Sequence, residues 1–291
     1  MKKLSFIKLL SSMVIFGTIG IFIRNINLTR GLIASARGIV GALFILLFSM
    51  LIKRRPSAKA IRKNLSTLLI SGVAIGANWI LLFESYSYTT IAISTLCYYM
   101  APVFVIIASI VFLRAKIDRQ KICSVSIALV GMLCISGVFS ANAQSGSFTG
   151  ILLALGAAVL YATVTILNKR LKDISSRDRT VTQLTIAGIT MLPYTLLFET
   201  NNLTTVDKNS IILLFTVCLL HTGIAYLLYF ASIKELPATT VAIFSYTDPI
   251  VAILISLILR EPISITTCIG AILIIASLIL SEINLPNLSK K

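Results

Sequence analysis

Apolar runs of about twenty residues recur along almost the entire chain, and they constrain its fold more than any other feature. An α-helix of about twenty apolar residues spans the hydrocarbon core of a lipid bilayer. Ten such runs occupy most of the 291 residues, and only short segments separate them. The sequence therefore predicts an all-α integral membrane protein with ten transmembrane helices and no room for a separate soluble domain.

We expect these helices at residues 6–25, 31–52, 65–85, 91–113, 121–140, 148–168, 181–198, 210–233, 238–259 and 263–283. The first run follows Met1-Lys2-Lys3, as the apolar part of a secretory signal does, but no small-residue cleavage site comes after it. We interpret it as a retained transmembrane helix.

The 26 lysine and arginine residues are distributed unevenly between the two sides of this arrangement. If the N-terminus is cytoplasmic, 21 of them lie on the cytoplasmic side, four lie outside, and Arg37 lies within the second helix. Cytoplasmic loops of membrane proteins carry an excess of lysine and arginine. We therefore expect both termini in the cytoplasm. The net charge of +16 is then a topology signal, and no nucleic-acid partner is expected.

One pattern occurs twice, and it divides the chain into related halves. Tyr99 precedes Pro102 by three residues in the fourth helix, and Tyr246 precedes Pro249 in the same way in the ninth, at an offset of 147 residues. Five helices per half is an odd number, so similar halves must cross the membrane in opposite directions. Inverted repeats of this kind are a recurrent plan of secondary transporters. We expect repeats at 1–140 and 148–291, joined by a linker at 141–147.

These features resemble the EamA-type branch of the drug/metabolite transporter superfamily. The resemblance rests on an aromatic residue beside small ones at 16–18 and 161–163, on Arg37, on the two central prolines, and on the turn Arg260-Glu261-Pro262. It implies a cavity between the repeats, lined mainly by the first, third, fourth, sixth, eighth and ninth helices. It also implies export of small metabolites from the cell across its inner or plasma membrane.

Asp248 is the clearest candidate for a functional side chain, because it lies eleven residues from either end of the ninth helix. A charge at mid-membrane costs about 2.5–3.5 kcal/mol, so it needs a reason. Asp248 could bind an amine of a substrate, take up a proton that drives transport, or bond to another helix. At the offset of 147, Ala101 occupies the matching position in the first repeat.

Several other polar or aromatic residues lie within the predicted helices. Arg37 and Glu84 could form an ion pair across adjacent helices, as a structural contact or an outer gate. His221 is the only histidine and could carry protons or pack against a neighbour. The remaining candidates for substrate contact are aromatic or amide side chains suited to a small amphipathic molecule, namely Asn78, Trp79, Tyr99 and Tyr246. Pro102 and Pro249 are candidate hinge residues.

The sequence favours a secondary active transporter with a small-molecule substrate, amino acids first, and it gives no oligomeric state. A P-loop is absent, so transport must use a gradient or an exchange partner. The five cysteines form no C-x-x-C pair, and we expect no metal, cofactor or catalysis. The alternatives are a proton-coupled effluxer of drugs or organic cations, a membrane enzyme acting on lipid, and a scaffold or receptor. A single Asp248 beside tyrosines favours an amine-bearing or zwitterionic substrate.

Overall fold

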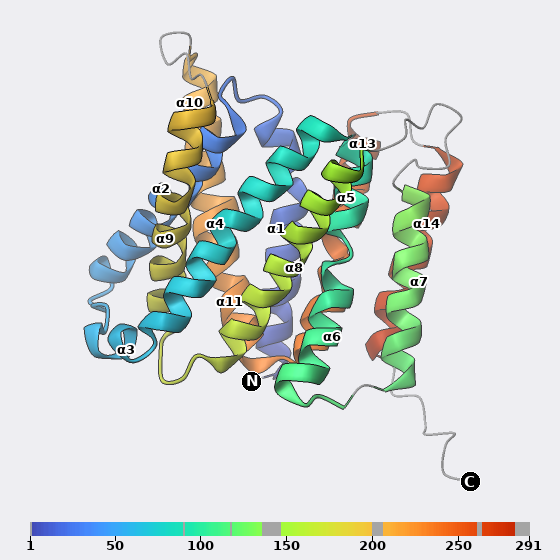
Figure 1. Cartoon of the computed structure of the whole chain (residues 1–291), viewed down its shortest axis with the longest axis horizontal. Helices are drawn as coiled ribbons and strands as arrows, with labels where there is room; N and C mark the ends of the chain where they lie inside the picture. Colours follow the sequence, from blue (N-terminus) through green and yellow to red (C-terminus); the bar gives the residue numbers. More distant parts are fainter. Residues whose placement is uncertain are drawn as a thin grey trace.

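The computed structural model describes residues 2–89, 91–116, 118–135, 147–199, 206–260 and 264–282, and all regular elements in these segments are helices. They pack as one bundle of roughly parallel and antiparallel rods (Figure 1). The elements are α1 (Lys2–Ile23), α2 (Arg30–Leu51), α3 (Ala58–Lys63), α4 (Leu65–Tyr88), α5 (Ile91–Tyr98), α6 (Ala101–Leu113), α7 (Arg119–Ile135), α8 (Phe148–Arg170), α9 (Ser176–Phe198), α10 (Lys208–Thr216), the π-helical segment η2 (Val217–Ile224), α11 (Ala225–Glu235), α12 (Ala238–Phe244), α13 (Thr247–Ile258) and α14 (Ile265–Glu282).

Eight helical stretches of the described segments are long and apolar enough to cross a bilayer, and Ile265–Ser281 is a shorter apolar helix. Three of the predicted helices are not regular throughout. The predicted helix at 91–113 is divided into α5 and α6, and that at 238–259 into α12 and α13. The predicted helix at 210–233 runs without interruption through α10, η2 and α11, but its middle is wound as a π-helix. The sequence linker falls mostly outside the described residues, which resume at Ser147, the N-cap of α8.

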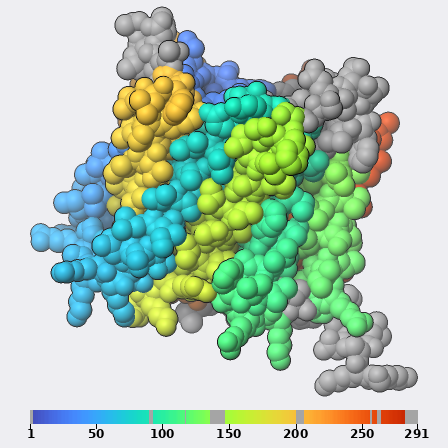
Figure 2. Space-filling view, viewed as in Figure 1, coloured from blue at the N-terminus to red at the C-terminus, as the bar shows by residue number. Residues whose placement is uncertain are grey.

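The two halves interdigitate. α4 packs against α8 and α9, α2 against α9, and α7 against α14, so every large interface joins the first half to the second. Figure 2 shows α8 between α4 and α6 on one face of the molecule. α1 lies deeper, against α11 and α13. The bundle thus has no internal boundary at which the halves could separate as independent domains.

Helices approach each other most closely at glycine positions, because glycine has no Cβ atom and lets a neighbouring backbone come near. A Cβ built on Gly38 in α2 would lie 2.7 Å from the Cα atom of Gly188 in α9. Gly72 and Gly76 in α4 also face α9, where a Cβ would meet Ile186 and Thr190. The Gly72-x-x-x-Gly76 pattern therefore serves packing within the bundle.

The short connections have a recurrent conformation. Arg114, which follows α6, has φ 51°, and Arg260, which follows the broken partner helix α13, has φ 56°. A non-glycine residue with positive φ is uncommon. Arg114 and Arg260 lie 146 residues apart, which is close to the offset of the repeat, whereas the other two described non-glycine residues with positive φ, Lys53 and Asp173, do not follow this offset.

We expect Gly38→Ala to lower the free energy of unfolding by about 1–3 kcal/mol, the usual cost of overpacking. The new methyl group would meet backbone atoms of Gly188, which cannot rotate away. The matched control is Gly20→Ala in α1, where a Cβ meets nothing within 4 Å. Unfolding of both variants in detergent would measure the difference. Equal stabilities would contradict the close contact of α2 with α9.

Candidate functional site

Two helix breaks face each other near the middle of the bundle. α5 ends at Tyr98 and α6 resumes at Ala101, with Pro102 in its first turn. α12 ends at Phe244 and α13 resumes at Thr247, with Pro249 in its first turn. Proline fits the first turn of a helix. In the interior of a helix it cannot donate the backbone hydrogen bond to the residue four positions earlier. The twin prolines thus account for both interruptions, as the sequence pattern indicated.

Two tyrosine hydroxyl groups connect the breaks across the repeats. The Tyr99 hydroxyl donates a hydrogen bond of 2.6 Å to Oδ1 of Asp248. The Tyr246 hydroxyl donates one of 3.0 Å to the backbone oxygen of Tyr99. The two rings lie 6.2 Å apart at 32°. Tyr99 at the first break thus bonds to the second break, and Tyr246 at the second break bonds to the first. Together the two hydrogen bonds hold both breaks at the same depth.

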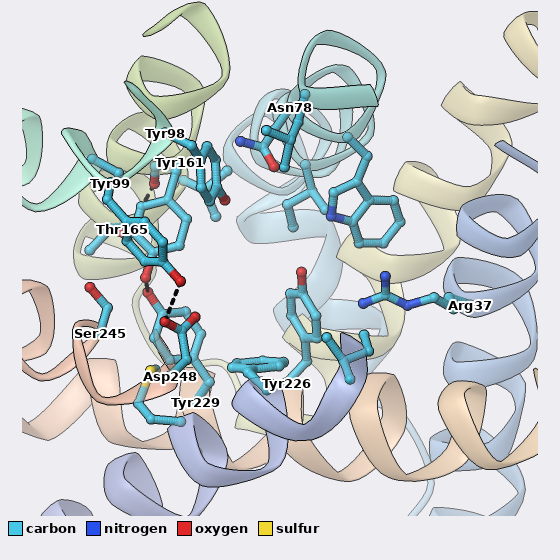
Figure 3. Close-up of a pocket in the computed structure, with 18 of the residues that line it drawn as sticks. Arg37, Asn78, Tyr98, Tyr99, Tyr161, Thr165, Tyr226, Tyr229, Ser245 and Asp248 are labelled. Carbon is cyan, nitrogen blue, oxygen red and sulfur yellow. Dashed lines mark hydrogen bonds between the residues drawn. The ribbon is translucent and has the colours of Figure 1, made fainter. Parts of the chain in front are cut away.

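A cavity of about 310 Å³ opens beside these breaks (Figure 3). It is lined by α1, α2, α4, α5, α6, α8, α11 and α13, and by the residues between the paired half-helices. These are the helices that the family resemblance implied, with α2 in addition. The lining residues with polar groups are Arg37, Asn78, Trp79, Tyr86, Tyr98, Tyr99, Tyr161, Thr165, Tyr226, Tyr229, Ser245 and Asp248.

Aromatic side chains make up much of the wall. Phe16 packs edge-on against Tyr226 at 5.2 Å and lies 6.1 Å from Tyr229. Tyr229 and Tyr161 share a hydrogen bond of 2.5 Å between their hydroxyl groups. Gly17 allows α1 to approach α13 closely, since a Cβ on Gly17 would lie 2.5 Å from the backbone oxygen of Asp248. The wall is thus amphipathic, with apolar ring faces and hydroxyl groups.

Arg37 forms the other charged part of the cavity. Its side chain is 7% exposed, its Nε donates to Thr222 Oγ1 at 3.0 Å, and its Cζ lies 5.3 Å from the centre of the Trp79 ring. Figure 3 shows its guanidinium group directed toward the cavity from the side opposite Asp248. The site therefore contains a carboxyl group and a guanidinium group that do not pair with each other.

The cavity extends toward one end of the bundle only. Ile19 and Ile23 near the end of α1, and Tyr86 near the end of α4, belong to its lining. We call that end, with the α4–α5 connection, the outer face, and the end carrying α3 the basic face. Toward the basic face the core is closed, because Phe6 packs on Phe244 with ring centres 4.6 Å apart.

A second cavity of about 370 Å³ lies on the basic face between α6, α7, α8 and α12. Its charged lining residues are Lys116, Asp118, Lys121 and Lys169. Buried Val105 and Ala242 belong to the packed cluster of α6, α8 and α12 that lies between the two cavities. The start of α6 lines the first cavity and its end lines the second, so one short helix borders both.

The structure sorts the candidate residues from the sequence into two groups. Those that line the central cavity are Asp248, Tyr99, Trp79, Asn78, Arg37 and Pro102. Asn78 also donates a hydrogen bond of 2.6 Å to the backbone oxygen of Ala157, so part of its amide holds α8 in place. Those outside the lining are Tyr246, His221, Glu84 and Pro249.

The residues of the second group lie behind the cavity wall or at its helix break. Tyr246 and His221 are fully buried and have protein partners, the Tyr99 backbone oxygen and, at 2.8 Å, Thr18 Oγ1. Neither contacts the cavity. The expected pairing of Arg37 with Glu84 does not form, because Glu84 accepts a hydrogen bond of 2.7 Å from the Tyr194 hydroxyl while Arg37 turns to Thr222.

The sequence interpretation missed part of the wall, namely Tyr226, Tyr229 and Thr165. A signal was available: Tyr226 and Tyr229 are three residues apart, and Tyr161 and Thr165 four apart, so each pair shares one helix face. Which face meets the cavity depends on the rotation of α8 and α11 within the bundle. These helices carry apolar residues on all their faces, so no hydrophobic stripe in the sequence indicates how each helix is rotated.

Comparisons with known proteins agree with the internal repeat. The model of the EamA-like transporter family matches residues 3–137 and again 148–283. An uncharacterized transporter of Bacillus subtilis, YxxF, is 29% identical over 87% of this chain and 81% of its own length. A probable amino-acid metabolite efflux pump of Salmonella typhimurium is 27% identical over 56% of this chain and 58% of its own. A crystal structure superposes with a TM-score of 0.84 over 96% of both chains at 13% identity, and thus shares the fold.

We expect Tyr246→Phe to lower the free energy of unfolding by about 0.5–2 kcal/mol, because the Tyr99 carbonyl loses a buried donor. The affinity of the cavity for ligands should change little, since Tyr246 is not in its wall. Unfolding in detergent measures the first effect. Tyr88→Phe, at a 51% exposed position, is the control. Unchanged stability of Tyr246→Phe would show that the bond contributes nothing.

Proposed function

This chain belongs to the EamA-like transporter family, and we propose that it is a secondary active transporter that exports small metabolites, with amino acids as the first candidates. The observation that carries this proposal is the central cavity, in which Asp248 and Tyr99 meet at the paired helix breaks. Broken helices at a repeat interface are where secondary transporters bind their substrates. The family and its relatives are transporters, which disfavours the lipid-modifying enzyme and the scaffold or receptor.

Alternating access would operate through α6 and α12. In the described conformation the central cavity extends to the outer face, and the packed cluster of Val105 and Ala242 separates it from the basic face. Moving α6 and α12 apart would join the substrate site to the second cavity, while α1 and α4 closed the outer side. The helix breaks supply the hinges, because each half-helix can pivot where backbone hydrogen bonds are missing.

We propose ten crossings in two inverted repeats, with α7 and α14 as the fifth and tenth, and both termini in the cytoplasm. The basic face would then be cytoplasmic and the described conformation outward-open. Support comes from the lysine and arginine distribution, since Lys53, Arg54, Arg55 and the charged end of α8 share this face. The membrane would be the cell membrane, and the oligomeric state stays undefined.

Amino-acid substrates fit the cavity better than the two alternatives do. An organic cation could bind Asp248 and the tyrosine rings, but Arg37 in the same cavity would repel it. A polyphosphate would need several buried cations, and Arg37 is the cavity's one arginine or lysine among its described lining residues. The name of the Salmonella typhimurium relative, a probable amino-acid metabolite efflux pump, points the same way.

Transport of radiolabelled amino acids into and out of proteoliposomes, with and without a pH gradient, tests the function. We expect wild-type protein to move at least one amino acid, and Asp248→Asn to reduce its rate about tenfold or more, the effect of losing a charged hydrogen bond of about 1.5–3 kcal/mol. If the pH gradient drives wild-type transport, Asp248→Asn should abolish that dependence. Absence of transport of every amino acid under any gradient would refute the proposal.

Cysteine labelling tests the topology. In a variant without the five native cysteines, Ser147→Cys before α8 should react with a membrane-impermeant maleimide in intact cells. Ser57→Cys before α3 should react only after lysis. Both positions are exposed and precede helices, so they form a matched pair. The reverse pattern would overturn the orientation.

A further inference from the structure

Arg37 is a buried cation without a protein anion. Its terminal amino groups have no hydrogen-bond acceptor among the described residues, since its polar contact uses Nε. Glu84 and Glu199, which also belong to the outer half of the bundle, accept hydrogen bonds from the Tyr194 hydroxyl and from the backbone nitrogen of Gly31, and no ion pair of either with Arg37 is found among the described residues. A buried charge is costly unless it is paired. The guanidinium group is therefore prepared for an anion that enters the cavity.

Asp248 is the complementary case. Among the described residues its carboxyl group has one side-chain partner, the neutral hydroxyl of Tyr99, and no basic group. Figure 3 shows Asp248 and Arg37 on opposite sides of the cavity, with the Tyr226 ring between them. The cavity thus has a negative pole and a positive pole at separate places.

Aromatic rings form the wall between the poles. Trp79 stacks beside Arg37 and lies 6.3 Å from the Tyr226 ring, which in turn contacts Phe16. Ring faces at these positions suit a chain of methylene or peptide groups.

We propose that the cavity binds an extended zwitterion, with its ammonium group at Asp248 and its carboxylate at Arg37. Short peptides and ω-amino acids have this form, because several bonds separate their charges. In an α-amino acid both charges are attached to one carbon atom, so only one pole can be satisfied directly. A guanidinium group binds a carboxylate in a bidentate manner, which gives the Arg37 end its selectivity. The proposal deepens the proposed function by naming the substrate class of the same cavity.

Trp79 makes the test direct, because it is the protein's single tryptophan and lies against Arg37. Purified protein in detergent is titrated with four probes, ε-aminocaproate, hexylamine, hexanoate and glycine, and dissociation constants are read from Trp79 fluorescence. We expect ε-aminocaproate to bind about tenfold or more tightly than each of the others, since it alone makes both charged contacts.

Substitutions then assign the poles. Arg37→Gln should weaken binding of ε-aminocaproate and hexanoate by about tenfold, and it should not weaken binding of hexylamine, which Arg37 repels. Asp248→Asn should weaken binding of ε-aminocaproate and hexylamine, and it should not weaken binding of hexanoate. Arg37→Lys, which keeps the charge, should bind hexanoate more tightly than Arg37→Gln does. If the glutamine variant does not fold, the lysine variant still tests the positive pole. Arg179→Gln is the matched control, because Arg179 is 2% exposed, lies over Phe230 and is outside the cavity.

The proposal is overturned if glycine binds as tightly as ε-aminocaproate, if Arg37→Gln weakens all probes equally, or if no probe binds. Binding is measured here without transport. A protein that binds ε-aminocaproate but moves nothing in proteoliposomes would retain the two poles and lose the transport function. A protein that transports α-amino acids but does not bind ε-aminocaproate would retain the transport function and lose the two poles.

Discussion

The site depends on the pair of hydrogen bonds that join the two helix breaks. A proline in a transmembrane helix leaves backbone carbonyls without donors, and a bilayer offers no water to satisfy them. At the break beside Pro102, the Tyr99 carbonyl receives a hydrogen bond from the Tyr246 hydroxyl, and the Tyr99 hydroxyl in turn donates to Asp248. Because each bond crosses from one repeat to the other, the breaks stabilise each other. The interruption that permits a hinge is thus also what positions the carboxyl group in the cavity.

The sequence predicted this centre well and its surroundings less well. Apolar run lengths predict the helices, and the spacing of Tyr99 and Pro102 relative to Tyr246 and Pro249 predicts both breaks. These signals are local or recur at a fixed offset. The partner of a buried polar side chain leaves no such signal in the sequence, because it depends on how the helices are rotated and on the angles at which they cross. For that reason Tyr246 was expected in the cavity and lies behind it, and Arg37 was expected beside Glu84 and contacts Thr222.

Thr222 shows why such a contact escapes a sequence argument. It lies in η2, the π-helical segment, where the backbone gains an extra residue per turn and side chains are rotated relative to a regular helix. A period of 3.6 residues applied to 210–233 therefore misplaces Thr222 and its neighbour His221. The same segment turns His221 toward Thr18 in α1 and away from the cavity. His221 therefore contacts α1 through Nε2, as a packing residue does.

The two charged residues of the cavity each lack a counterpart in the other repeat. At the offset of 147, Ala101 corresponds to Asp248 and buried Leu184 to Arg37. The backbone, the prolines and the tyrosines are duplicated, but one charge comes from each half. In the proposed mechanism a symmetric scaffold would give the same motion in both directions, whereas recognition of an asymmetric molecule needs distinct ends. Placing the cation in α2 and the carboxyl group in α13 would meet both needs, since each repeat could change its conformation while the two ends of the substrate stayed at the same two side chains.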